Sequence, residues 1–201
     1  TERKRAEAEI SQNAEQLAAT LNIQHALAAA LDQHAIWMNL GQGVQQLFPD
    51  VATIFVSSYD PERQMISAKY GCQDGELVDH GALPPIPLSP PGQGQQSHVI
   101  HTRQPLVIAA GLEEQLAHNN VVVFVGSGDE GTQSALYVPM LAHDQVLGVI
   151  QLQSYAPNRF QVTDIRLLTL VANTAAVSIQ NAQLYEVAQN EIDERRQAES
   201  A

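Results

Sequence analysis

The amino-acid sequence predicts an α+β domain, with helices packed on a central, mostly antiparallel β-sheet of five or six strands. Three observations lead to this fold class. Both ends of the chain carry apolar residues at helical spacing. The middle holds β-branched segments separated by short turns, which is typical of neighbouring antiparallel strands. Hydrophobic residues make up 44% of the 201 residues, enough to form a core.

The N-terminal stretch has the clearest periodicity. Apolar residues follow one another at alternating steps of four and three, the pattern of a coiled-coil seam. We therefore expect one long helix that ends at Pro49–Asp50, with the seam facing a partner helix and the later half packed on the globular body. Polar Gln24 either fixes the register of that seam or is merely tolerated in it. The seam positions are Ile10, Ala14, Leu17, Leu21, Gln24, Ala28, Leu31, Ala35 and Met38.

The middle of the chain reads as two hairpins with a helix and a strand between them. A loop with five prolines, residues 83–91, cannot be a central strand because proline lacks the N–H that a sheet needs. The second hairpin is expected to turn at His143–Asp144. The predicted elements are strands at 51–59 and 64–70, a short helix at 95–102, and strands at 106–109, 134–139 and 146–153.

The C-terminal stretch predicts a helix that outruns its domain. Thr163–Asp164 is the expected N-cap, apolar residues recur as far as Val187, and the chain then becomes charged in NEIDERRQAES. Such an end usually connects a domain to another one. We accordingly divide the chain into an N-terminal linker helix (1–20), a central domain (21–185) and a C-terminal connector helix (186–201), and expect a homodimer through the terminal helices within a longer protein.

Composition argues against several partners and compartments. The 22 acidic and 10 basic residues give a net charge of −12, and no Lys/Arg cluster of the kind that binds nucleic acid is present. The single cysteine, Cys72, permits no internal disulfide and no thiolate metal cluster. His98 and His101 lack a third ligand at helical spacing, so we expect no metal. No uninterrupted apolar run approaches a membrane span, so we expect no membrane insertion of this segment and a cytoplasmic location.

A glycine-rich stretch, VVVFVGSGDEGTQ, spells a dinucleotide-binding fingerprint at Gly126, Gly128 and Gly131. That fingerprint needs a helix directly after it, because the helix N-terminus binds the pyrophosphate. Here a strand pattern follows, and Asp129 and Glu130 would repel phosphates. We therefore interpret the stretch as a surface loop, or as a lid over a ligand pocket, rather than as a nucleotide site.

In its motifs and their order, the chain resembles the GAF domain, a small-molecule sensing module of signalling proteins. The resemblance covers roughly Leu21 to Tyr185 and implies terminal helices on one face of the sheet, with loops and short helices over the other. The ends are similar to linkers that join GAF domains to histidine-kinase or cyclase modules. Four stretches carry the resemblance to the GAF domain: IFVSSYDPERQMISAKYG, the segment Gly94–Ile108, SALYVPMLAHDQVLGVIQLQS, and NRFQVTDIRLLTLVANTAAVSIQNAQLYE.

The resemblance also implies a ligand pocket, in which a mostly apolar surface carries a few polar groups. On the last strand, Ile150 and Leu152 share one face, and Gln151 and Gln153 share the other with Val149. The two glutamines either hydrogen-bond to an unknown small molecule or meet only water and loop backbone. The candidate pocket residues are Ile54, Val56, Phe124, Tyr137, Val149, Gln151 and Gln153.

The leading hypothesis is a non-catalytic sensor that relays ligand binding through its helices to an effector domain. The alternatives are a ligand-free dimerisation spacer, or an enzyme that uses Cys72 or the glycine loop at 126–131. Cys72 has no resolving partner for redox chemistry, and it is followed by Gln73 where bilin-binding relatives commonly have His, so we expect no bilin. The cyclic-nucleotide motif of the family is incomplete, since Ile165 stands where a Glu is required.

Overall fold

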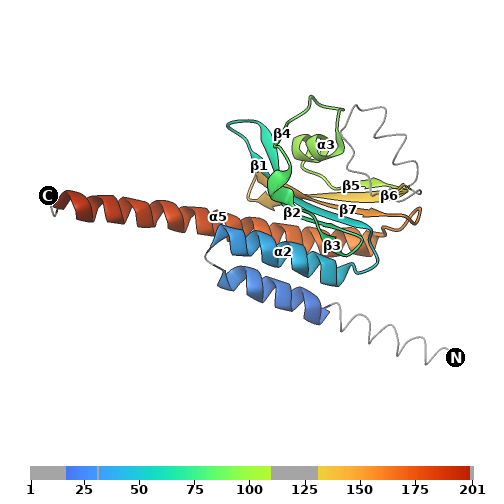
Figure 1. Ribbon diagram of the computed structural model, residues 1–201, viewed down its shortest axis with the longest axis horizontal. Coiled ribbons are helices and arrows are strands. Elements are labelled where there is room, and N and C mark those ends of the chain that lie inside the picture. The colour runs from blue at the N-terminus through green and yellow to red at the C-terminus, as the bar shows by residue number, and fades with distance from the viewer. Residues whose placement is uncertain (1–16, 31, 110–130, 200–201) are drawn as a thin grey trace.

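The computed structural model describes residues 17–30, 32–109 and 131–199, which form layers around one sheet (Figure 1). Helices α2 (Gln33–Leu47) and α5 (Val162–Glu199) cover one face of the sheet, and α3 (Gln95–Thr102) lies over the other. A further helical segment, residues 17–29, lies beyond α2 and α5, on their side away from the sheet. This arrangement confirms the predicted α+β class.

Within the described residues the sheet is antiparallel and has seven strands, in the order β3-β2-β1-β7-β6-β5, with β4 also paired to β2. The predicted hairpins, the helix at 95–102 and the turn at His143–Asp144 are confirmed. The prediction missed β3 and β4, which have two residues each at the sheet edge, and a 3-10 turn at His80–Ala82. The strands are β1 (Thr53–Asp60), β2 (Met65–Gln73), β3 (Glu76–Leu77), β4 (Ile86–Pro87), β5 (Leu106–Ile108), β6 (Ser134–Ala142) and β7 (Gln145–Ser154).

The N-terminal stretch is not one continuous helix, as we had predicted. The first helical segment ends at residue 29, and α2 begins at Gln33 and runs back alongside it (Figure 1). Asp32 starts the second helix, because its Oδ2 accepts a hydrogen bond of 2.9 Å from the backbone N–H of Ala35. The sequence prediction overlooked this N-cap. The end of α2 just before Pro49–Asp50 is as expected.

The seam leucines of the first helical segment do not join the core. In the first helical segment the buried apolar residues are Ile23 and Leu27, neither of which belongs to the seam, whereas Leu17 is 61% exposed and Leu21 is 47% exposed. Packing thus selected the other apolar stripe of this segment. The seam positions Ile10, Ala14 and Leu31 lie outside the described residues.

The main core lies between the sheet and the helices α2 and α5, and we call it the helix-side core. Small residues of α5 and glycines of α2 allow the backbones to approach closely. At Gly41, any Cβ would overlap the ring of Tyr70, which is fully buried and donates a hydrogen bond of 2.9 Å to Gln45 Oε1. Members of the helix-side core include Ile23, Leu27, Leu40, Val44, Ile54, Val56, Tyr70, Cys72, Leu136, Val138, Ile150, Leu152, Leu168, Val171, Ala175 and Ile179.

The start of α5 is held by an ion-pair network. Arg159 donates to both carboxylate oxygens of Asp50, at 2.6 and 2.9 Å, and to Asp164 Oδ2 at 3.1 Å. Asp164 is not the N-cap that we predicted, because it lies in the first turn of the helix. Its Oδ2 accepts a hydrogen bond of 2.8 Å from the backbone N–H of Gln161, which precedes the helix. The network therefore joins the turn after α2 to the beginning of α5.

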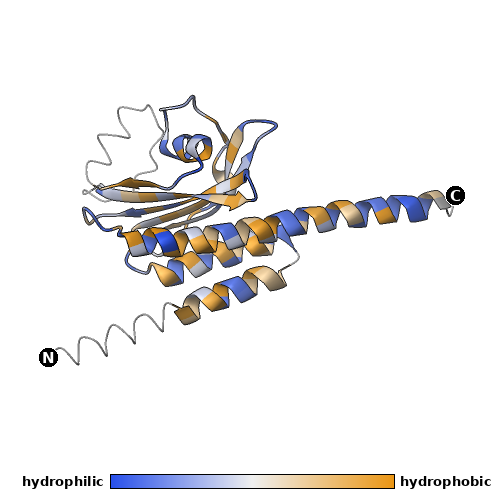
Figure 2. Cartoon of the chain, turned by 180° about the vertical axis from the view of Figure 1, so that it is seen from behind, coloured by the Kyte–Doolittle hydropathy of each residue, from blue (hydrophilic) through white to orange (hydrophobic). Residues whose placement is uncertain are grey.

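By length and composition alone, α5 is long and apolar enough to span a membrane. The core helix of a globular domain meets the same criterion, and Leu168, Val171 and Ile179 of α5 are buried in the helix-side core. Past the sheet the helix continues alone toward the C-terminus and becomes increasingly hydrophilic (Figure 2).

We expect Gly41→Ala to destabilise the domain by about 1–3 kcal/mol, because the new methyl group overlaps the buried ring of Tyr70. Helix propensity alone gives the opposite sign, since Ala stabilises a helix by about 1 kcal/mol relative to Gly. Urea unfolding of the variant measures the difference. Gln42→Ala, at the exposed neighbouring position, is the control and should change stability by less than about 0.5 kcal/mol. A Gly41→Ala protein more stable than wild type contradicts the packing argument.

The ion pair of Asp50 makes stability depend on pH. The hydrogen bond and charge of Arg159 hold the pKa of Asp50 below its ordinary 3.8, so the pair stabilises the fold above pH 3.8 and this contribution disappears as the pH falls through the folded-state pKa. Because the Asp50 side chain is 55% exposed, solvent screening limits its contribution to about 0.5–1 kcal/mol. Asp50→Asn should cost that amount in urea unfolding at pH 7 and less at pH 3; an equal loss at both pH values contradicts this account.

Candidate functional site

The face of the sheet beneath α3 carries a row of polar and aromatic side chains. Across three neighbouring strands, Phe55 of β1 lies opposite Gln151 of β7, which lies opposite Tyr137 of β6. In the next row, Gln153 lies between Thr53 and Ala135. Directly opposed residues share a face, so these side chains form one surface together with Val149. The structure therefore brings together Tyr137, Val149, Gln151 and Gln153, four of the predicted pocket residues.

Two other predicted pocket residues lie on the wrong face. Ile54 pairs with Leu152 and Val56 pairs with Ile150, so both belong to the helix-side core and are buried there. The error was one of strand parity: β1 and β7 are far apart in the sequence, and nothing in either strand reveals their register. The β1 residues on the α3 side are Thr53, Phe55 and Ser57. The remaining candidate, Phe124, lies outside the described residues.

Hydrogen bonds join the sheet to α3 at this surface. Gln96 Nε2 donates a hydrogen bond of 2.9 Å to Gln151 Oε1. Gln96 Oε1, in contrast, is buried and has no hydrogen-bond partner among the described residues. The hydroxyl of Thr132 donates a hydrogen bond of 3.5 Å to Gln153 Oε1. We call Gln96, Gln151, Gln153 and Tyr137 the glutamine cluster. A buried acceptor without a donor is rare in proteins, so Gln96 Oε1 marks this cluster as incomplete.

The tyrosine of the cluster is electrically neutral at ordinary pH. Burial raises the pKa of Tyr137 to about 12, and a hydrogen bond with Gln153 offsets part of that shift. Its hydroxyl therefore keeps its proton near pH 7 and can donate a hydrogen bond. Within the described residues, the side chains that hydrogen-bond to the cluster are themselves uncharged.

Apolar side chains surround the glutamine cluster and form a second, smaller core, the α3-side core. Gln96 was not predicted as a site residue, but a signal for it exists: Gln96, Val99 and Ile100 are spaced i, i+3, i+4 and so share one helix face. Since that face packs on the sheet, the spacing places Gln96 over β7. The α3-side core consists of Ile66, Val99, Ile100, Ile108, Ala135, Tyr137, Val146 and Val149.

The residues considered for catalysis lie elsewhere. Cys72 is buried in the helix-side core, on the face of the sheet opposite the glutamine cluster, and burial raises the pKa of its thiol. The described residues contain no group of three or more His, Cys, Asp or Glu side chains placed to hold a metal. After Gly131 the chain enters β6 at Ser134, so a strand follows the glycine stretch, as predicted, and not the helix of a dinucleotide site. The rest of that stretch, 121–130, lies outside the described residues.

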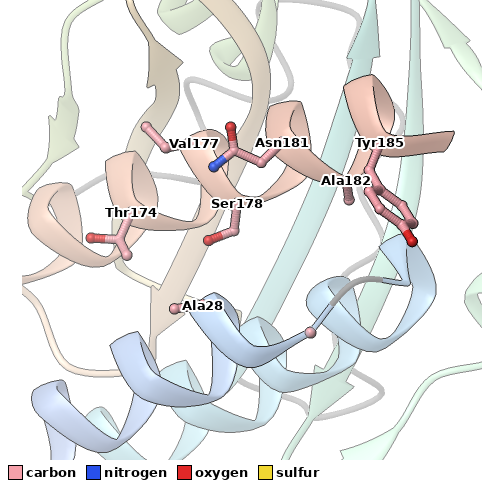
Figure 3. A pocket seen from close by; sticks show the side chains of 8 residues that line it. Ala28, Thr174, Val177, Ser178, Asn181, Ala182 and Tyr185 are labelled. Carbon is pink, nitrogen blue, oxygen red and sulfur yellow. The ribbon is translucent and has the colours of Figure 1, made fainter. Parts of the chain in front are cut away.

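A groove of about 590 Å³ runs between the first helical segment and α5 (Figure 3). Gln24 Nε2 lies 3.5 Å from Thr174 Oγ1 across the two helices. Along α5, Leu170, Val177 and Leu184 are exposed at seven-residue spacing, which places them on one side of the helix. The groove is lined by Ala28, Ala30, Thr174, Val177, Ser178, Asn181, Ala182 and Tyr185.

Comparison with protein families identifies this architecture. The model of the GAF domain matches residues 30–180, which is most of the chain. The chain belongs to the GAF domain family. The matched range lies inside the predicted central domain (21–185), and the limits of that domain remain predictions. A search of the curated proteins finds no match.

Solved structures share the fold at low identity. The GAF domain of the Acinetobacter phosphoenolpyruvate-protein phosphotransferase has a TM-score of 0.70 at 16% identity, over 85% of this chain and 95% of that one. The free methionine-R-sulfoxide reductase of Neisseria meningitidis has a TM-score of 0.65 at 17% identity, over 83% and 89%. Residues 122 to 287 of a methyl-accepting chemotaxis protein have a TM-score of 0.65 at 16% identity, over 81% and 98%. A domain of a phosphotransferase, a reductase and a segment of a chemotaxis protein thus share this fold, so the fold alone leaves the activity open.

The burial of Cys72 predicts an unreactive thiol. We expect Ellman's reagent at pH 8 to label the folded protein at least about 100-fold more slowly than the urea-unfolded protein, because reaction requires an accessible thiolate. Stopped-flow absorbance measures both rates. Equal rates contradict the buried position and restore Cys72 as a candidate redox residue.

Proposed function

We propose that this GAF domain is a non-catalytic sensor that binds a small molecule at the glutamine cluster and passes the signal through α5. One observation carries the proposal: the same two strands, β6 and β7, hold Tyr137 and the glutamines on one face and support α5 on the other. The chain also passes from β7 into α5 through residues 155–161. A ligand that shifts these strands therefore acts directly on the helix that leaves the domain.

Linkage sets the strength of such a signal. A ligand shifts the equilibrium between two arrangements of sheet and helix only by the ratio of its affinities for them. In this proposal, the arrangement that binds ligand more tightly is the one in which Gln151 and Gln153 are best placed, and α5 carries the difference to an adjoining domain. A histidine-kinase or cyclase output and a cytoplasmic location fit this role and are part of the proposal.

The same proposal includes a homodimer formed through the terminal helices. The exposed residues Leu170, Val177 and Leu184 form an apolar stripe, and Leu17 and Leu21 add apolar surface on the neighbouring helical segment. A second copy that contributes the same surfaces would bury both stripes in a helical bundle around the groove of Figure 3.

A ligand-free spacer is the second candidate. It is favoured by the dense packing of the α3-side core, in which Val99 is fully buried and Tyr137 and Val149 nearly so. The spacer needs the dimer but no ligand. It gives no role to Gln96 Oε1, which has no hydrogen-bond partner within the described residues. Redox catalysis through Cys72 is a weaker candidate, because its thiol lies across the sheet from the glutamine cluster.

A native mass spectrum of the purified protein tests the sensor and spacer functions together. We expect a dimer that carries a defined extra mass, and we expect Gln151→Leu to lose that mass while remaining dimeric. Val177→Glu, which places a charge in the apolar stripe, should shift the protein to monomer.

The outcomes separate the candidates. If neither the purified protein nor the protein incubated with a metabolite extract carries an adduct, the spacer replaces the sensor. If wild type is monomeric at every concentration, the dimer is wrong. An adduct that survives in Gln151→Leu moves the ligand away from the glutamine cluster.

A further inference from the structure

The glutamine cluster also indicates which chemical class of ligand it binds. We infer that the ligand is an uncharged, planar molecule with an N–H donor and a carbonyl acceptor side by side on one edge, as in a lactam or a pyrimidine base. This inference rests on the proposed ligand-binding function and adds the identity of the ligand class. Four features of the cluster lead to it.

The unpartnered oxygen of Gln96 requires a donor. Gln96 Oε1 is buried without a hydrogen-bond partner among the described residues, and a buried acceptor in that state destabilises the fold. A ligand N–H or O–H pointing at this oxygen removes the cost. A ligand that offers only acceptors leaves it in place, so the cluster selects for molecules that can donate.

The amide of the same side chain supplies the second contact. Gln96 Nε2 carries two hydrogens, and the hydrogen bond of 2.9 Å to Gln151 Oε1 uses one of them. The other hydrogen and Oε1 belong to one planar amide group. Glutamine pairs in this two-point manner with a neighbouring acceptor and donor on the edge of a nucleobase. A lactam edge offers the same two groups.

Among the described residues, the hydrogen-bond partners of the cluster are uncharged, which favours a neutral ligand. Gln96 and Gln151 hydrogen-bond to each other. Gln153 hydrogen-bonds to Thr132 and to Tyr137, and Tyr137 is neutral at ordinary pH. Burying an ionised ligand beside these groups costs free energy that no opposite charge offsets. Neutral amides lose much less on leaving water.

The neighbours of Gln151 favour a flat ligand. Phe55 and Tyr137 are the residues directly opposite Gln151 on the two adjacent strands, so an aromatic ring lies on each side of its amide. Above them, Val99 of α3 contributes an apolar surface. Aromatic and apolar side chains around a few polar groups suit a planar heterocycle.

Two probes with the same ring and the same two carbonyls, one with N–H groups and one with N-methyl groups, test the inference. Uracil has the required N–H and C=O edge, whereas 1,3-dimethyluracil keeps the ring and both carbonyls but has no N–H. We expect uracil to shift the side-chain amide resonances of Gln96 and Gln151 in 15N-edited NMR spectra, and 1,3-dimethyluracil to bind at least about tenfold more weakly. Benzoate, a flat anion, should leave these resonances unchanged.

Matched variants localise the effect. Gln96→Leu should weaken uracil binding at least about tenfold, while Gln42→Leu, an equivalent change at an exposed position of α2, should leave it unchanged. The backbone amide spectrum and Tm of each variant show whether it is folded. If Gln96→Leu does not fold, Gln96→Glu takes its place, and the comparison of the two uracils on wild type needs no variant.

Three results overturn the inference. If the two uracils bind equally well, the ligand does not need an N–H donor. If benzoate shifts the resonances of Gln96 and Gln151, the ligand does not need to be neutral. If uracil at millimolar concentration does not shift these resonances, the inferred ligand class is wrong. Each of these results leaves the sensor function standing, since the native mass spectrum decides separately whether the domain carries any ligand.

Discussion

The pairing of β7 with both β1 and β6 is the constraint on which the rest of the structure depends. It joins the two hairpins, which are remote in the sequence, into one sheet, and it gives β7 two buried faces. One face, with Ile150 and Leu152, anchors the helices through apolar contacts; the other, with Gln151 and Gln153, is polar within an apolar surround. Gly148 permits this pairing, because a side chain there would strike the carbonyl of Ser57.

Sequence patterns predicted those parts of the fold that depend on neighbouring residues. Alternation along β7 separated Ile150 from Gln151, and turn residues placed both hairpins, because strand alternation and turn chemistry are local properties. The register between β1 and β7 is a long-range property, and Ile54 and Val56 were accordingly placed on the wrong face. The contact between Gln96 and Gln151 depends in the same way on how α3 docks, although helical spacing already aligned Gln96 with Val99.

The N-terminal stretch shows how two apolar stripes compete for one core. The regular stripe through Leu17 and Leu21 predicts a seam for a partner helix, and both residues are exposed. Ile23 and Leu27 of the other stripe make the contacts with the body of the domain. The choice was made possible by the break at Asp32, which lets the first segment fold back against α2. Periodicity identifies apolar stripes, but it does not say whether a stripe meets its own domain or another molecule.

The unbroken length of α5 has a mechanical consequence. Ala182 is the last residue of α5 in the helix-side core, yet the helix continues to Glu199 without interruption. At about 1.5 Å per residue, the part past Ala182 is an arm roughly 25 Å long. With its inner end held between the sheet and the Arg159 network, this arm acts as a lever. A tilt of about 10° at the sheet displaces its tip by roughly 4 Å, which is most of a helical turn. In the proposed sensor, the length of α5 therefore enlarges a small movement of the sheet into a larger one at the far end.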